Sequence, residues 1–247
     1  MRKIIIILLM LPLLVNAQNG QYLGAGSGTT KLLLHLNGNS TDVSGNSNNG
    51  TDSNVTYSLA NGKFNQGTSF NGTSSKITLG TSSTLNVYNS FTISIWFKTL
   101  DSSLYQIFFS KSVELICGIY EQKIFTQLVD NYTEAGNIIN DSKWHLFTST
   151  YNGTTCKVYL DGVLGQSKNM SSSSQTASAY IGFFPIPQLS FKGSIDEVII
   201  ENRAWTASEV RKYFTYSRGW LFGEIQDKTD LNNLKMFIPE KINYLSA

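Results

Sequence analysis

The sequence contains few of the residues on which most catalytic and metal-binding motifs depend. Its 247 residues include two histidines, two cysteines and four prolines, and only 15% are charged. No Cys-x-x-Cys or His-Glu-x-x-His pattern occurs, so a zinc site is not expected. The Gly-x-Ser-x-Gly motif of serine hydrolases is also missing. His35 and His145 are best interpreted as hydrogen-bonded histidines of a sheet, although a dyad of either one with Cys156 or a serine stays open.

The chain also lacks an excess of charge of either sign. It has 19 basic and 17 acidic residues, and two of the basic ones, Arg2 and Lys3, lie at the extreme N-terminus. Without those two the count is 17 against 17. No cluster of basic residues stands elsewhere to neutralise phosphates, so nucleic acid is not an expected partner.

Residues 1–17 carry the one long apolar run. Arg2 and Lys3 precede the apolar stretch 4–15, and Val15-Asn16-Ala17 has small residues where a signal peptidase cleaves. This pattern predicts a signal peptide over 1–17, an exported protein that starts near Gln18, and no membrane span after cleavage. An uncleaved membrane anchor is the alternative. The glycine-rich residues 18–29 are interpreted as a flexible linker.

Short runs typical of β-strands follow, separated by turn residues. In FTISIWFK (91–98) apolar and polar residues alternate with a period of two, and tight turns are expected at Asn152-Gly153 and Asp161-Gly162. The predicted strands are 31–36, 68–72, 75–79, 91–98, 105–110, 113–120, 123–130, 144–151, 156–160, 177–183 and 191–200. Many short strands at this spacing indicate an all-β sandwich or barrel.

One helix is signalled near the C-terminus. Thr206-Ala-Ser-Glu209 has the form of a capping box, and the sequence EVRKYF continues it. Residues 217–247 form an extension whose structure the sequence leaves open. Cys117 and Cys156 lie in apolar strand-like runs, and either a disulfide between them or two buried thiols is consistent with export.

Five blocks of sequence, in order, resemble the laminin-G-like, concanavalin A-like jelly-roll domains of secreted bacterial and phage proteins. The blocks are LLLHLNGNSTDVSGNSNNGT, GKFNQGTSFNGTSSKITLG, FTISIWFKT, WHLFTSTYNGTTCKVYLDGVL and FKGSIDEVIIENRAWTASEV. The resemblance implies an antiparallel two-sheet jelly-roll sandwich over residues 30–216, with one short C-terminal helix. Because this fold hosts lectins, enzymes and adhesion modules alike, it does not specify a ligand.

The loop DVSGNSNNGT (42–51) is a candidate calcium site. Oxygen-bearing side chains fall at alternate positions, as in calcium loops. The resemblance implies a structural Ca²⁺ held by Asp42, Asn46 and Asn48 together with Asp196 of the GSIDEV strand. The alternative is a loop whose polar side chains satisfy its own backbone.

Aromatic residues outside the expected core face are candidates for carbohydrate binding, because sugar C–H faces stack on aromatic rings. The aromatic candidates are Trp96, Tyr105, Tyr120, Tyr132 and Tyr180, with Gln127 and Asn131 as neighbouring hydrogen-bonding groups. Each could instead cover the outside of a sheet or pack beneath a loop.

The GSIDEV strand argues against a glycoside hydrolase. The fold also carries laminarinase-type glucanases, whose catalytic acids share one face of a strand. Regular alternation would place Asp196 and Glu197 on opposite faces, which leaves no paired acid and nucleophile.

The sequence therefore favours an exported, non-catalytic recognition module. Its expected partner is a polysaccharide, a cell-surface glycan or a surface protein, and its expected cofactor is structural calcium. The alternatives are an adhesion or virion-surface protein that assembles through residues 217–247, and, less favoured, a glycoside hydrolase.

Overall fold

The structure is a computed structural model that describes residues 28–136, 139–174, 176–186 and 189–217, apart from the Tyr216 side chain. The predicted signal peptide, nearly all of the linker, and residues 218–247 lie outside the described residues, so the domain boundaries stay predictions. Among the described residues, no helix has both the length and the apolar character needed to cross a membrane.

Fifteen strands and one α-helix form the described part of the chain. The strands are β1 (Thr30–Leu34), β2 (Thr51–Ser53), β3 (Thr56–Ser58), β4 (Gly67–Asn71), β5 (Lys76–Gly80), β6 (Phe91–Lys98), β7 (Tyr105–Lys111), β8 (Leu115–Tyr120), β9 (Lys123–Leu128), β10 (Asn131–Ala135), β11 (His145–Tyr151), β12 (Thr155–Leu160), β13 (Val163–Asn169), β14 (Ala179–Ile181) and β15 (Lys192–Glu201). The α-helix is α2 (Ala207–Ser217), and two short 3₁₀ turns are η2 (Leu59–Asn61) and η3 (Ser83–Leu85).

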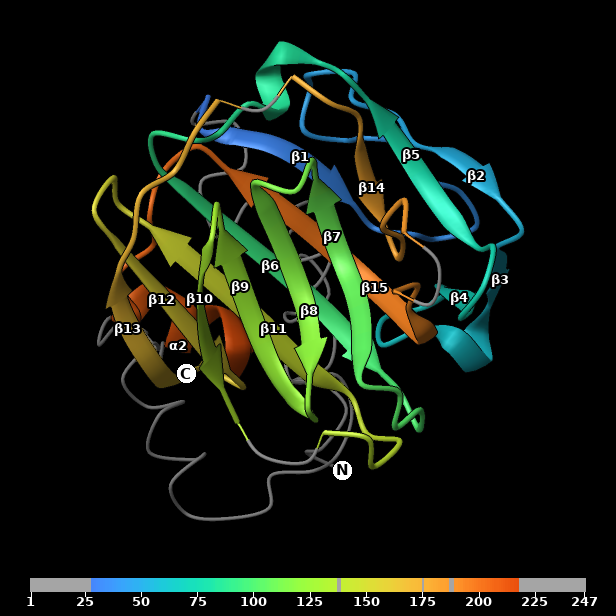
Figure 1. Cartoon of the computed structure of the whole chain (residues 1–247). Coiled ribbons are helices and arrows are strands. Elements are labelled where there is room, and N and C mark those ends of the chain that lie inside the picture. Colours follow the sequence, from blue (N-terminus) through green and yellow to red (C-terminus); the bar gives the residue numbers. More distant parts are fainter. Residues whose placement is uncertain (1–27, 137–138, 175, 187–188, 218–247) are drawn as a thin grey trace, which may run out of the picture. The chain divides into compact units, whose positions relative to one another are not determined.

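The strands form two antiparallel sheets that lie one in front of the other in Figure 1. The seven-stranded sheet has the order β10-β9-β8-β7-β14-β5-β2 and faces the viewer. The eight-stranded sheet has the order β13-β12-β11-β6-β15-β4-β3, and β1 also pairs with β15. Their facing sides enclose the main core, so the predicted all-β, two-sheet jelly-roll sandwich is confirmed.

Alternation along β6 shows why the sequence forms this core. Phe91, Ile93, Ile95 and Phe97 all belong to the main hydrophobic cluster between the sheets. The opposite side of β6 is also buried, and Trp96 there is only 1% exposed. A second layer therefore covers the outer side of the eight-stranded sheet.

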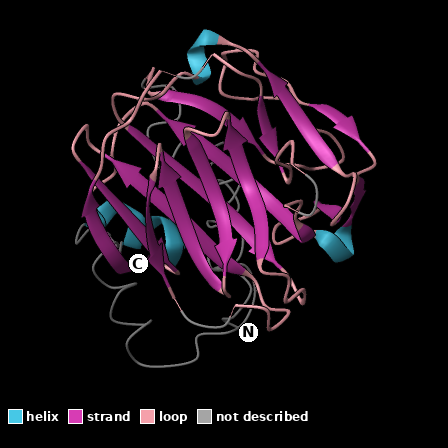
Figure 2. Cartoon of the chain, in the orientation of Figure 1, coloured by secondary structure: helices cyan, strands magenta, loops and turns pink. Residues whose placement is uncertain are grey.

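Helix α2 supplies part of that layer (Figure 2). Its Val210 packs with Leu33, Tyr159, Ile199 and Trp205 in a second hydrophobic cluster. The predicted capping box is present, because the Glu209 amide donates to Thr206 Oγ1 at 3.2 Å and the Thr206 amide donates to Glu209 Oε2 at 2.7 Å.

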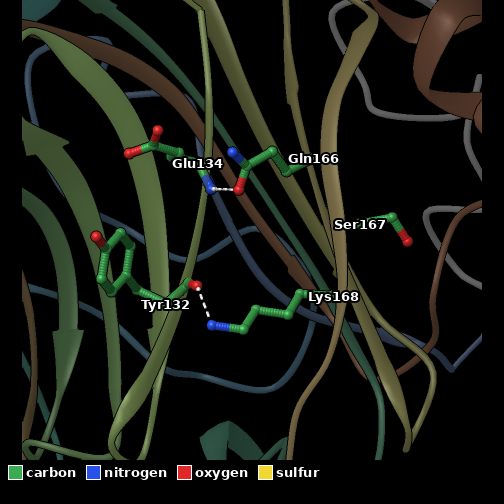
Figure 3. Close-up of a pocket in the computed structure, with 5 residues that line it drawn as sticks. All are labelled: Tyr132, Glu134, Gln166, Ser167 and Lys168. Atoms are coloured by element: carbon green, nitrogen blue, oxygen red, sulfur yellow. Dashed lines mark hydrogen bonds between the residues drawn. The ribbon is translucent and has the colours of Figure 1, made fainter.

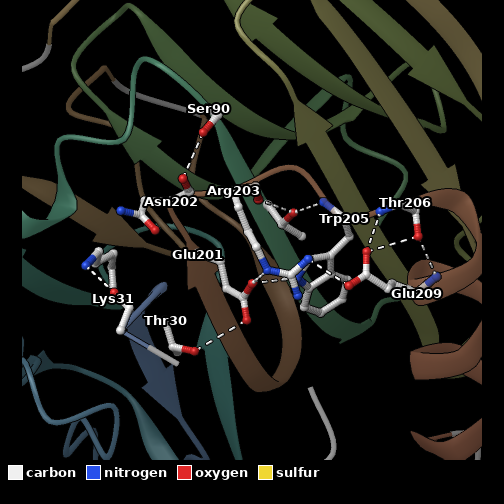
Figure 4. A network of polar contacts seen from close by, with 11 residues as sticks. Thr30, Lys31, Ser90, Glu201, Asn202, Arg203, Trp205, Thr206 and Glu209 are labelled. Atoms are coloured by element: carbon white, nitrogen blue, oxygen red, sulfur yellow. Dashed lines mark hydrogen bonds and ion pairs between the residues drawn. The ribbon is translucent and has the colours of Figure 1, made fainter. Parts of the chain in front are cut away.

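A buried carboxylate ties the start of α2 to the sheet (Figure 4). Glu201 is 1% exposed and accepts hydrogen bonds from Trp205 Nε1 at 2.8 Å and from Thr30 Oγ1 at 3.3 Å. Arg203 lies 2.8 Å from Glu201 and 2.7 Å from Glu209. The network compensates the burial of Glu201 with a charged partner and neutral donors.

The predicted strands are confirmed with shifted ends, but four strands were not predicted. These are β2, β3, β10 and β13, which are short, polar or exposed. The turn at Asp161-Gly162 has positive φ at both residues, as a tight hairpin requires, and Gly153 also has a positive φ.

The disulfide left open by the sequence is absent from this structure. Cys117 lies on β8 and Cys156 on β12, in opposite sheets, and both are fully buried free thiols. The Cys117 sulfur lies 3.8 Å from Thr126 Oγ1, and the Cys156 sulfur lies 3.6 Å from Ser149 Oγ. Burial raises the pKa of both thiols, that of Cys156 to about 12, so neither is a reactive thiolate at neutral pH.

Candidate functional site

Three of the predicted ligand-binding tyrosines lie together on the outer side of the seven-stranded sheet. Tyr105 on β7 stands directly opposite Tyr120 on β8, and Tyr132 lies on the edge strand β10. These three and Phe125 on β9 are named here the tyrosine surface. Tyr105 and Tyr120 are partly exposed, and Tyr132 is 48% exposed.

The rings of the tyrosine surface pack against one another. Tyr105 and Tyr120 stack with centroids 4.5 Å apart, and Phe125 meets both edge-on at 6.4 and 6.5 Å. Tyr132 meets Tyr120 at 6.2 Å with an angle of 81° between their planes. The ring planes of Tyr120 and Tyr132 are therefore nearly perpendicular, which is the edge-to-face arrangement that aromatic pairs favour.

A glycine on β8 lets the strands of this surface approach closely. Gly118 is the register partner of Phe125 on the neighbouring strand β9. On its other side, the register of β8 with β7 shifts between Ile107 and Phe109. A Cβ atom at Gly118 would lie 2.2 Å from the carbonyl oxygen of Gln106. A side chain there is therefore excluded by backbone contact.

Polar groups border the rings. Lys123 Nζ lies 2.7 Å from Glu134 Oε1, in a partly exposed ion pair. Of the predicted hydrogen-bonding residues, Asn131 is exposed in the same hairpin, and Gln127 stands opposite Tyr132. Gln127 Nε2 donates to the carbonyl of Val129 at 3.0 Å, so this amide already serves the β9–β10 turn.

The phenol of Tyr120 is hydrogen-bonded to a neighbouring carboxylate. Its hydrogen bond to Glu121 raises its pKa to about 12. At neutral pH the tyrosine surface therefore presents Tyr120 as an uncharged phenol.

Trp96, a predicted ligand-binding residue, is covered in this structure. Its ring stacks on Phe214 of α2 at 5.9 Å and meets Phe64 edge-on at 6.4 Å. The ring is only 1% exposed, because α2 and the loop after η2 cover that side of β6. Tyr180 lies on the other half of the seven-stranded sheet, where it packs against Phe183 at 5.5 Å.

A pocket of about 450 Å³ opens beside Tyr132, where the two sheets meet at β10 and β13 (Figure 3). It is named here the edge pocket, and Tyr132, Glu134, Gln166, Ser167 and Lys168 line it. The Glu134 amide donates to Gln166 Oε1 at 3.4 Å, and Lys168 Nζ donates to the Tyr132 carbonyl at 3.3 Å. Side chains of β13 thus satisfy backbone groups of the sheet edge at β10.

The predicted calcium loop covers the free edge of β1. Asp42 is 8% exposed, and its Oδ1 accepts from the amides of Leu33 at 3.0 Å and Ser44 at 2.9 Å. Its Oδ2 accepts from the Asn48 amide and the Ser44 hydroxyl, both at 2.9 Å. The two asparagines act in the same way: Asn46 Nδ2 donates to the Thr30 carbonyl and Asn48 Nδ2 to the Lys31 carbonyl.

These side chains, as arranged, do not fit a calcium ion. Calcium needs six to eight oxygen ligands, whereas four donors already occupy both oxygens of Asp42. Asp196, the fourth predicted ligand, is engaged elsewhere: its Oδ2 accepts from the amides of Lys63 and Phe64 at 2.8 and 2.9 Å. Among the described residues, no group of three or more His, Cys, Asp or Glu could hold a metal. Calcium binding at the loop stays a prediction.

The expectation that Asp196 and Glu197 point to opposite faces is wrong. The β6–β15 register shifts between Asp196 and Ile199, and Glu197 has a φ of +48°. Ile195 and Val198 both face the main core, so the two residues between them both point outward. Glu197 lies 2.9 Å from His35 Nδ1, and this contact raises the pKa of His35.

Two acids on one face do not make a glycosidase site here. Asp196 is fully buried, and burial together with Glu197 raises its pKa to about 8. Three backbone amides hold its oxygens, the third being that of Glu197 at 2.9 Å. The carboxyl therefore links β15 to the loop after η2 and is closed to a polysaccharide.

Sequence reasoning missed Phe125, Lys123, Glu134, Gln166 and Lys168. All lie on β9, β10 or β13, and the last two of these strands were not predicted. A hairpin register for KIFTQLVDNYTEA would have placed Glu134 beside Phe125. The meeting of β10 with β13 joins residues more than 30 positions apart, and no local pattern signals it.

Comparisons with known proteins agree with this architecture. The family model of the concanavalin A-like lectin/glucanases superfamily matches residues 71–211, which is more than half of the chain. None of the curated proteins matches the sequence significantly.

Several solved structures share the fold. The binding domain of Paraclostridial Mosquitocidal Protein 1 aligns with a TM-score of 0.66 and 16% identity, over 76% of this chain and 52% of that one. Domain 4 of AbnA, an extracellular arabinanase from Geobacillus stearothermophilus in complex with arabinotriose, aligns with a TM-score of 0.61 and 22% identity, over 74% of this chain and 97% of that one. A botulinum neurotoxin type C structure, from work on cell entry through two ganglioside molecules, aligns with a TM-score of 0.59 and 19% identity, over 77% and 51%. The chain thus spans about half the length of the toxin structures it matches.

Proposed function

The chain belongs to the concanavalin A-like lectin/glucanase superfamily, and we propose that it is an exported, non-catalytic recognition module whose tyrosine surface binds carbohydrate. The observation that carries the proposal is the gathering of Tyr105, Tyr120 and Tyr132 on one open sheet face. Aromatic rings offer the flat apolar area on which sugar C–H groups pack, and their polar tips reach hydroxyls.

The surface is ordered before a ligand arrives. Phe125 touches both Tyr105 and Tyr120, and Tyr132 abuts Tyr120, so the rings have little rotamer freedom to lose on binding. The Lys123–Glu134 pair adds a donor and an acceptor at the border of the rings. These features are what a lectin-like site for a short stretch of polysaccharide requires.

Similar structures support a binding role. The AbnA domain was solved with arabinotriose, and a toxin binding domain was solved in complex with rat synaptotagmin II. A glycan is favoured here over a protein partner because stacked, partly exposed rings dominate the surface. The burial of Asp196 supports a non-catalytic role.

A polysaccharide panel tests the proposal. Affinity electrophoresis of the wild-type protein would first identify ligands, and isothermal titration would then compare Tyr120→Ala and Tyr132→Ala. Loss of a central aromatic contact should weaken binding by about 1–2 kcal/mol, or roughly 5- to 30-fold. The matched control is Tyr88→Ala, because Tyr88 is a partly exposed tyrosine outside the tyrosine surface.

Binding that Tyr88→Ala weakens as much as Tyr120→Ala would place the ligand elsewhere. A blank panel, with the fold intact by circular dichroism, would favour the adhesion or assembly alternative. Export has its own measurement: the mass of the secreted protein should correspond to a chain that starts at Gln18.

A further inference from the structure

Lys168 is the one charged side chain of the edge pocket that lacks an opposite charge. Its ammonium donates to the neutral Tyr132 carbonyl at 3.3 Å and lies 5.8 Å from the centroid of the Tyr132 ring. Within the described part of the chain, no carboxylate lies within 4.0 Å of it. Glu134, the other charged residue of the pocket, is paired with Lys123 at 2.7 Å.

Gln166 of the edge pocket is also suited to donate. Gln166 Oε1 already accepts from the Glu134 amide, which leaves the Gln166 NH₂ group for a ligand. Ser167 also lines the pocket, but its hydroxyl points away from β10. Figure 3 shows Gln166 and Lys168 projecting from β13 toward β10, on the side where Tyr132 and Glu134 lie. An ammonium without a charged partner, beside a free amide donor, is complementary to an anion.

Tyr132 belongs to both the tyrosine surface and the edge pocket. A sugar held against its exposed ring would present a substituent to Lys168 without moving either strand. The volume of about 450 Å³ is sufficient for one or two sugar units. The position of the pocket therefore allows Lys168 to interact with a charged group of a glycan that is bound at the tyrosine surface.

We propose that the edge pocket selects acidic glycans, with the anionic group of one sugar paired to Lys168 while its ring packs on Tyr132. The inference rests on the proposed function and narrows its ligand class. The shared chemistry is an anion on a sugar, and its source is either a uronic acid carboxylate or a sulfate ester.

Two matched pairs of polymers separate these sources. Polygalacturonate is compared with its methyl ester, and dextran sulfate is compared with dextran, so the members of each pair share a sugar backbone and differ in charge. The purified full chain should bind one acidic polymer at least fivefold more tightly than its neutral partner. Because exposed ion pairs are screened by salt, this preference should decline between about 0.05 and 0.5 M NaCl.

Variants locate the effect. Lys168→Gln keeps a donor for the Tyr132 carbonyl but removes the charge, and it should weaken binding of the acidic polymer by about 5- to 10-fold while leaving the neutral one unchanged. Lys168→Arg should restore the preference to within threefold. The matched control is Lys157→Gln, because Lys157 on β12 stands opposite Ser167 and lies outside the pocket lining.

The outcomes are distinguishable. Equal affinity for charged and neutral polymers, or an equal loss in Lys157→Gln, overturns the acidic-glycan inference and leaves the proposed function standing. Binding to none of the polymers or of the wider polysaccharide panel overturns both. Thermal melting of each variant confirms that the fold is retained.

Discussion

Replacing Asp42 by alanine should destabilise the protein whether or not calcium is present. The carboxylate accepts hydrogen bonds from three backbone amides and one hydroxyl, and it satisfies the Leu33 amide on the free edge of β1. Leu33 and Asn48 are both buried, with 4% of each residue exposed. Two buried amides would therefore lose their acceptor in Asp42→Ala.

The magnitude follows from those two amides. Leaving a buried donor unpaired costs about 1–3 kcal/mol, so the pair costs about 2–6 kcal/mol. Entry of water into the space left by the carboxylate favours the lower half of that range, about 3 kcal/mol. For a domain of this size, that loss lowers the melting temperature by about 6–12 °C.

The assay is thermal melting of wild type and Asp42→Ala in millimolar CaCl₂ and in chelator. The hydrogen bonds predict the same loss in both buffers. A calcium site predicts a different result, because a bound ion at 100 times its Kd adds about 2.7 kcal/mol that chelator removes.

The reasoning is refuted if the effect of Asp42→Ala largely disappears in chelator, since the carboxylate would then act mainly by holding calcium. Asn39→Ala is the matched control. Asn39 makes a similar turn contact with the Thr41 amide at 2.9 Å but is exposed, so its loss should change stability by less than about 0.5 kcal/mol.

The remaining predictions concern the interior and α2. Because Cys117 and Cys156 are buried free thiols, a reductant should leave the melting temperature unchanged, and a fall would reveal a disulfide. Thr206→Ala removes the acceptor of the Glu209 amide and should cost about 1 kcal/mol, whereas Thr206→Ser should retain wild-type stability; equal melting of all three proteins would contradict the capping role. The raised pKa of Asp196, about 8, means that the folded state holds the proton more tightly than the unfolded chain, so this group's contribution to stability is lost as the pH rises from about 4 to about 8. In urea melts at pH 5, 7 and 9, the advantage of wild type over Asp196→Asn should shrink with pH, and an advantage that grows with pH would show that the folded carboxyl is charged.

Secondary structure was predictable where burial imposes a pattern. β6 is buried on its core side by Phe91, Ile93, Ile95 and Phe97, and that period of two is visible in the sequence. The capping box at Thr206 was also predictable, because its threonine and glutamate stand at a fixed spacing in the sequence. β13 escaped prediction because all seven of its residues are exposed, so no apolar alternation marks it.

The site was predictable only in part. Tyr105 and Tyr120 flank a hairpin, and the pairing of β7 with β8 brings them opposite each other. Tyr132 lies on β10, which pairs with β9 in a further hairpin. Lys168 comes from the other sheet, so only the closure of the sandwich edge brings it to Tyr132.

By itself, then, the sequence determined the class of fold, most strands, the helix cap and the group of candidate tyrosines, because these depend on local periodicity and turn chemistry. Only the tertiary structure decided which outward-facing aromatics stay accessible. Trp96 and Tyr120 both point away from the core, yet α2 covers Trp96 while Tyr120 remains partly exposed. It also decided that Asp42 completes a strand edge and that a bulge turns Glu197 to the side of Asp196. Accessibility, edge pairing and bulges arise from contacts between distant segments, and no single stretch of sequence contains them.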